Sequence, residues 1–118
     1  KFMKKPDNNP KTAFGLKKTP LDLLPPEALR QMAEAMRSGA DKYGPYNWRE
    51  AGISSSIYIA AAMRHILAFA DGEDKDPESG LAHLAHGLAN LAILLDGQYY
   101  ECLNDDRPSK KKMTTVNT

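Results

Sequence analysis

Two histidines and an asparagine line one side of an apolar stretch in the second half of the chain. His83, His86 and Asn90 stand at positions i, i+3 and i+7, a spacing that places them on one face of an α-helix. A buried polar group costs about 1 to 3 kcal/mol when it lacks a hydrogen-bond partner, so polar groups must face this seam. Arg64 and His65, on the preceding apolar stretch, are the nearest candidates. The seam is either a ligand or metal site between two antiparallel helices or a set of hydrogen bonds that fixes helix register.

An acidic segment joins these two apolar stretches. Of the carboxylates between residues 71 and 78, we assign Glu73, Asp76 and Glu78 to a metal site. Oxygen ligands at this density suit Mg²⁺ or Mn²⁺, which often hold substrate phosphates at the same time. The competing explanation is structural, because acidic residues at a helix start also cap backbone amides and complement the helix dipole.

A loop rich in aromatic residues over 42–48 offers the other half of a nucleotide site. Tyr43 and Trp48 can stack on a base, Asn47 can bond its edge, and Lys42 can meet phosphates. The competing role for Trp48 is a lid over the core. Together with two residues of the helices, the expected ligand-binding set is Lys42, Tyr43, Asn47, Trp48, Arg64 and Asn90.

Three stretches with helical spacing of apolar residues predict helices over about 26–38, 55–71 and 77–96. Pro26 suits the first position of the first helix, Ser54 or Ser55 can cap the second, and Asp76 can cap the third. A glycine follows the expected end of each helix. The sequence therefore predicts an all-α fold, a compact bundle of three main helices with an extended N-terminal arm.

The length of 118 residues suits one domain with one core. We expect a basic extended arm over 1–20, a helical domain over 21–100 and a tail over 101–118, with its Lys110–Lys112 run. The apolar segment 21–26 is expected to pack on the core. Because Tyr58 and Ile59 lie on two adjacent apolar stripes of the second helix, we expect a homo-oligomer, most simply a dimer, to cover both.

Bulk properties narrow the function classes. Apolar residues make up 42% and charged residues 26%, as in ordinary globular proteins. A net charge of +1 argues against nucleic acid or an anionic membrane as partner, and no apolar run approaches the roughly 20 residues that span a bilayer. The single cysteine, Cys102, fits a reducing cytoplasm. Phosphate-binding glycine loops and zincin or hydrolase motifs are absent from the sequence.

Several strings together carry a family resemblance. They are LDLLPPEAL at 21–29, GADKYG at 39–44 followed by NW at 47–48, RH at 64–65 and GEDKDPESGLAHLAH at 72–86. Over about residues 15–97 the sequence resembles the N-terminal domain of phage dATP/dGTP diphosphohydrolases. The resemblance implies phage nucleotide metabolism in the host cytoplasm, with a purine deoxynucleoside triphosphate cleaved to monophosphate and pyrophosphate. The paired helical carboxylates of MazG-type pyrophosphohydrolases do not occur on the helices expected here.

Two functions remain open, with a structural or assembly module as a third. In the first, Mg²⁺ or Mn²⁺ on the acidic segment bridges phosphates and a histidine acts as general base to water; the candidates are His65, His83 and His86. In this scheme Arg64 and Lys42 neutralise charge. The alternative is a non-catalytic protein that binds a nucleotide in the same pocket and sequesters a host nucleotide signal.

Overall fold

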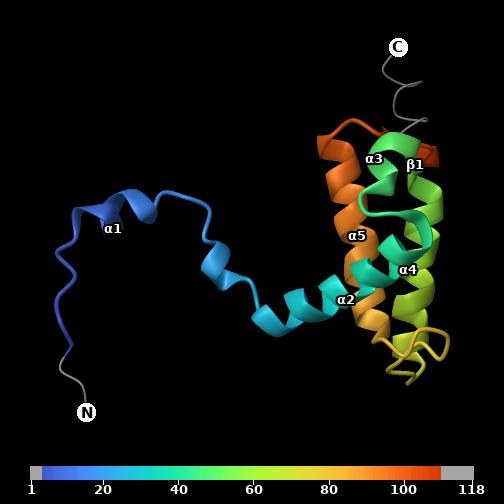
Figure 1. The fold of residues 1–118 in the computed structure, drawn as a ribbon, viewed down its shortest axis with the longest axis horizontal. Coiled ribbons are helices and arrows are strands. Elements are labelled where there is room, and N and C mark those ends of the chain that lie inside the picture. The colour runs from blue at the N-terminus through green and yellow to red at the C-terminus, as the bar shows by residue number, and fades with distance from the viewer. Residues whose placement is uncertain (1–3, 110–118) are drawn as a thin grey trace.

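Two long antiparallel helices form the centre of the fold, α4 (Ser55–Ala70) and α5 (His83–Tyr99) (Figure 1). They make the most extensive contact between any two elements of the computed structural model, which describes residues 4–109. The third long helix, α2 (Pro26–Tyr43), packs its C-terminal half across α5. The predicted all-α fold with three main helices is confirmed.

A small sheet closes the end of the bundle where α4 begins. Strand β1 (Ile53–Ser54) pairs in parallel with β2 (Leu103–Asn104), with Ile53 opposite Leu103 and Ser54 opposite Asn104. The short helix α3 (Asn47–Ala51) precedes β1 and contacts α5. Part of the segment expected to be a tail thus returns to the start of α4. The Lys110–Lys112 run lies outside the described residues.

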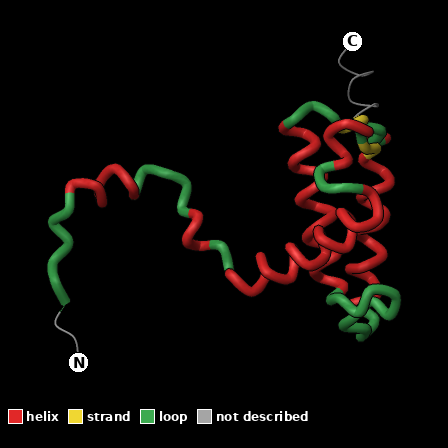
Figure 2. Tube along the Cα trace, viewed as in Figure 1, coloured by secondary structure: helices red, strands yellow, loops and turns green. Residues whose placement is uncertain are grey.

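The N-terminal arm runs away from the bundle (Figure 2). It contains a short helix α1 (Pro10–Gly15) and a 3-10 turn over Leu21–Leu23, so it is not extended throughout. The expectation that the segment 21–26 packs on the core is wrong: its leucines are exposed, as are Phe14 and Leu16. The prolines keep this segment apart from α2, whose first residue is Pro26 as predicted.

The helix boundaries differ from the prediction at three places, one of which is the end of the third helix at Tyr99 rather than at about residue 96. The first helix continues through Gly39 to Tyr43 and ends at Gly44, whose φ of 91° is open to glycine at little cost. The third helix begins at His83 rather than at Pro77. Asp76-Pro77 has the local sequence pattern of a helix start. In the structure the backbone of this segment instead pairs across the turn, Lys75 with Ala82, so the helix cannot begin there.

The turn over residues 71–82 is held by backbone hydrogen bonds. Lys75 and Ala82 form an antiparallel bridge, the amide of Asp76 donates to the carbonyl of Leu81 at 2.8 Å, and the amide of His83 donates to the carbonyl of Asp74 at 3.0 Å. Asp76 therefore does not cap α5. Its Oδ1 accepts the amide of Glu78 at 2.8 Å within the turn.

Small residues make the contact between helices. Ala35 of α2 is buried against Ala85 and Ala89 of α5, with Met32 and Met36 packed around them. Larger apolar residues of α4 and α5 are exposed in the single chain; among them are Met63, Ile66, Leu67, Leu88, Leu91 and Leu95. Among the described helices, none is both long and apolar enough to cross a bilayer.

Candidate functional site

Three histidines meet where the end of α4 lies beside the start of α5. His83 and His86 occupy the first turn of α5 and face His65 of α4, whose ring stacks on that of His86 with centroids 4.6 Å apart. The Nδ1 atoms of His65 and His83 lie 2.9 Å apart. The antiparallel pairing of the two helices thus brings together the histidines that the sequence places 18 and 21 residues apart.

The protonation of the His83 ring is set by its neighbours. Its Nε2 lies 2.7 Å from Oε1 of Glu73, and because a carboxylate only accepts, Nε2–H donates. The neutral ring then has a lone pair on Nδ1, which accepts the Nδ1–H of His65. His83 is only 5% exposed, and both of its ring nitrogens have a hydrogen-bond partner. The polar partners that the sequence requires for a buried His83 are therefore present.

Asp76 completes the cluster from the turn. One oxygen of Asp76 and one ring nitrogen from each of His65 and His83 all lie within 4.8 Å of one another. The hydrogen bond from the amide of Glu78 lowers the pKa of Asp76, and burial, followed by the charge of His86, lowers the pKa of His65. The lowered pKa values favour an ionised Asp76 carboxylate and a neutral His65 imidazole at neutral pH.

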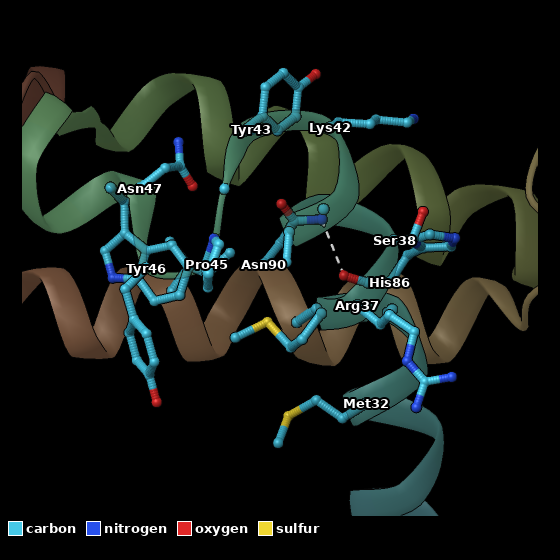
Figure 3. Close-up of a pocket in the computed structure, with 18 of the residues that line it drawn as sticks. Met32, Arg37, Ser38, Lys42, Tyr43, Pro45, Tyr46, Asn47, His86 and Asn90 are labelled. Carbon is cyan, nitrogen blue, oxygen red and sulfur yellow. Dashed lines mark hydrogen bonds between the residues drawn. The ribbon is translucent and has the colours of Figure 1, made fainter.

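His86 connects the cluster to a neighbouring pocket. Its Nε2 lies 2.7 Å from the hydroxyl of Ser79, which also accepts the amide of Leu81. The amide nitrogen of Asn90, one turn further along α5, donates to the carbonyl of His86 at 2.9 Å, as Figure 3 shows. One face of His86 thus meets His65 while the residue also lines the pocket.

The pocket is an open cavity of about 530 Å³ between α2, the loop that follows it, and α5. Asn90 lies at its centre, between the loop and α5 (Figure 3). Its floor is apolar, formed by Met32, Met36, Ala89 and Ile93, and Lys42, Tyr43, Asn47 and Trp48 line the side toward the loop. A pocket that is mostly apolar with a few polar groups suits a planar heterocycle.

The aromatic side of the pocket is fixed to α5 by Asp96. The indole nitrogen of Trp48 donates to Oδ2 of Asp96 at 2.7 Å, and the guanidinium of Arg49 binds both carboxylate oxygens. The hydrogen bond from Arg49 is the main cause of a lowered pKa for Asp96. Arg49 also lies over the rings of Tyr46 and Tyr100. The sequence reasoning missed Asp96, although an acid near the end of an apolar helix was a visible signal.

The structure brings most of the expected residues into two adjoining groups. His65, His83, Asp76 and Glu73 form the cluster, and the pocket takes His86 together with Lys42, Tyr43, Asn47, Trp48 and Asn90. Two expected residues stand apart within the described part of the chain. Glu78 contributes its backbone amide to the turn, and exposed Arg64 lies outside both the cluster and the pocket lining.

The fold and site define a class of all-helical protein with a histidine and carboxylate cluster beside an open pocket. The profile of the family described as dATP/dGTP diphosphohydrolase, N-terminal, matches residues 8–107, and the chain belongs to this family. A dATP/dGTP diphosphohydrolase of Salmonella phage PMBT28 is 33% identical over 81 residues, which are 69% of this chain and 27% of that relative. The chain thus corresponds to about a quarter of the length of that relative. No solved structure matches it significantly.

Proposed function

We propose that this chain binds a purine deoxynucleoside triphosphate and hydrolyses it to the monophosphate and pyrophosphate in a reaction that needs a divalent cation. The observation that carries the proposal is the position of His86, which lines the pocket and stacks on His65 of the cluster. A base in the pocket can therefore direct its phosphates toward the cluster. Family membership and the name of the phage relative support this substrate class.

The pocket supplies groups for each part of such a ligand. Met32, Met36 and Trp48 form apolar walls for the base. The side-chain nitrogen of Asn90 is already hydrogen-bonded, and its side-chain oxygen can accept a hydrogen bond from an exocyclic amine of the base. Lys42, at the rim, supplies a positive charge for a phosphate oxygen. The Trp48 ring is 6% exposed, so we assign it to the wall rather than to a mobile stacking lid.

The cluster supplies the groups for hydrolysis. A water oxygen attacks the α-phosphorus, the bond from that phosphorus to the bridging oxygen breaks, and pyrophosphate leaves with that oxygen. We assign the uptake of the water proton to His86, which lines the pocket and whose ring stacks on that of His65 in the cluster. A divalent cation would neutralise the charge that develops on the phosphate oxygens. Such a reaction belongs in the host cytoplasm, where deoxynucleotide pools are found.

The test is a panel of the four deoxynucleoside triphosphates with Mg²⁺ or Mn²⁺, in which pyrophosphate release and calorimetric binding are measured side by side. We expect release from dATP and dGTP, lost in His86→Ala. Tyr99→Ala, on an exposed ring of α5 outside the pocket lining, is the matched control and should act as the parent does. Failure of all four nucleotides to bind would overturn the proposal.

Binding without release in either metal would support the second candidate, a non-catalytic nucleotide-binding protein that sequesters a host nucleotide signal. One observation favours it. The match covers 27% of the phage relative, so the remaining length of that relative has room for a catalytic domain of its own.

We further propose that the exposed apolar face of α4 and α5 is covered by a second copy of the chain. Met63, Leu67, Leu91 and Leu95 of these two helices are between 47% and 68% exposed. Large apolar side chains left exposed on two packed helices are typical of a surface that a partner covers.

In this assembly the helical unit from α2 onward forms the body, and the arm lies outside it (Figure 1). Light scattering at micromolar concentration is expected to give a dimer. Replacing exposed leucines of the shared face, as in Leu67→Arg with Leu91→Arg, should yield monomers, whereas Glu34→Arg on the exposed side of α2 should not. A parent chain that is monomeric would contradict the assembly.

A further inference from the structure

We infer that His65, His83 and Asp76 form a binding centre for a first-row transition-metal dication, in preference to Mg²⁺, with Glu73 as the outer partner of His83. The role of the cation in hydrolysis rests on the proposed function, whereas the binding of the cation does not depend on it. It differs from a site made of acidic residues alone, since two of the three ligands are imidazoles.

The donor set carries the choice of metal. Imidazole nitrogen suits first-row transition metals, whereas Mg²⁺ demands oxygen ligands and keeps several waters. Ring nitrogens of His65 and His83 and a carboxylate oxygen of Asp76 lie within 4.8 Å of one another. Among the described residues, no other group of three or more histidine, cysteine or acidic side chains brings its donor atoms this close together.

The two ring nitrogens already lie close enough to share one cation. Nδ1 of His65 and Nδ1 of His83 are 2.9 Å apart, the distance of a hydrogen bond. A dication that displaces the shared hydrogen can take both nitrogens as ligands after a small adjustment of the rings. Three protein ligands leave the other coordination positions of such a cation to water or phosphate oxygens.

The outer partner is already in place. Metal-binding histidines commonly donate their other ring N–H to a carboxylate, which fixes the tautomer and raises the basicity of the ligating nitrogen. Nε2 of His83 makes such a bond to Glu73 at 2.7 Å, so its Nδ1 is the nitrogen left to ligate. On metal binding the hydrogen between the two Nδ1 atoms leaves His65 Nδ1, and the His65 ring takes the tautomer protonated on Nε2.

The backbone fixes the third ligand relative to the other two. The amide of Glu78 holds Oδ1 of Asp76, and the amide of His83 bonds to the carbonyl of Asp74 in the same turn. The turn and the start of α5 therefore move as one unit, and α4 supplies the remaining ligand. A ligand set held by three backbone segments is preorganised before the metal arrives.

The experiment is a titration of the full chain with Co²⁺ in the absence of nucleotide, followed by visible absorption, with calorimetry for Mn²⁺, Zn²⁺ and Mg²⁺. We expect one Co²⁺ per chain, seen as a change in its visible absorption bands, and Mg²⁺ binding at least tenfold weaker. His65→Ala and Asp76→Asn should each lower Co²⁺ affinity tenfold or more, and Glu73→Gln should lower it about 10- to 100-fold.

Glu78→Gln is the matched control, since it removes a neighbouring carboxylate outside the converging group and should leave Co²⁺ affinity unchanged. Circular dichroism of each variant distinguishes loss of metal binding from loss of folding. If a histidine variant unfolds, Asp76→Asn still tests the site, because Asp76 lies on a partly exposed turn. Equal affinity for Mg²⁺ and Co²⁺, or binding that survives His65→Ala and Asp76→Asn, would overturn the inference. The Co²⁺ titration contains no nucleotide. A chain that binds Co²⁺ here but releases no pyrophosphate in the nucleotide assay would therefore contradict only the proposed hydrolysis.

Discussion

The indole nitrogen of Trp48 donates to Oδ2 of Asp96 across 2.7 Å, which joins the short helix α3 to the C-terminal part of α5. The guanidinium of the adjacent Arg49 binds the same carboxylate through both oxygens. One acid near the end of a helix thus holds the wall of the pocket in which we place the base.

Replacing Asp96 is therefore expected to destabilise the fold as well as the pocket. Asp96→Ala leaves the buried indole N–H of Trp48 without its acceptor, at a cost of about 1 to 3 kcal/mol in the free energy of unfolding. Asp96→Asn keeps an acceptor oxygen and should cost less. Urea denaturation of both variants measures the difference, with Asp22→Ala on the exposed arm as control. Equal losses for Ala and Asn would contradict this role.

Acid stability should depend on Asp106. Its carboxylate accepts from the hydroxyls of Ser55 and Ser56 and from the amide of Ser56 at the start of α4, and these bonds lower its pKa to about 2 from 3.8. The unfolded chain thus takes up the proton at higher pH than the folded one. The stabilisation is complete above about pH 4 and is lost as the pH falls toward 2.

Asp106→Asn is expected to lower the thermal midpoint at pH 7 and to flatten its decline between pH 4 and pH 2. Midpoints of parent and variant across that range are the measurement. Asp22→Asn, outside the bundle, should follow the parent curve. An unchanged midpoint at neutral pH would show that Asp106 does not hold the start of α4.

Two glycines of α5 should respond in opposite directions to alanine. At Gly87 an added Cβ meets no atom within 4 Å, so Gly87→Ala gains about 0.5 to 1 kcal/mol from reduced backbone entropy of the unfolded chain. At Gly97 it would lie 2.9 Å from Cδ1 of the buried Ile53, beneath the β1–β2 pair. Gly97→Ala should cost about 1 to 3 kcal/mol from overpacking, before that gain is counted. Chemical denaturation ranks the two variants, and a Gly97→Ala chain as stable as Gly87→Ala would be inconsistent with tight packing there.

Asn90 is expected to contribute to base binding rather than to chemistry. Its amide nitrogen is engaged by the carbonyl of His86, which orients the amide oxygen at the centre of the pocket. Asn90→Ala should weaken nucleotide binding about tenfold, the equivalent of one hydrogen bond of about 1.4 kcal/mol. Gln98→Ala, an exposed amide further along the same helix, is the calorimetric control. Unchanged nucleotide affinity would place the base elsewhere.

Much of the architecture could be predicted because its causes are local. Apolar residues at helical spacing and Pro26 at a helix start are visible in a short window, so the three long helices were expected close to where they lie. The start of α5 was placed too early, because Asp76-Pro77 has the local signature of a helix cap. The bridge between Lys75 and Ala82 overrides that signature, and pairing across a turn is not a local property.

The sequence by itself determined that His83, His86 and Asn90 share one helical face and that each needs a polar partner if it is buried. Only the tertiary structure shows which residues are those partners. Antiparallel packing of α4 on α5 brings His65 rather than Arg64 to the seam, and the turn gives Asp76 to the cluster and Glu73 to His83. The reason is that spacing along a helix fixes a direction, whereas a contact between two elements depends on how both pack.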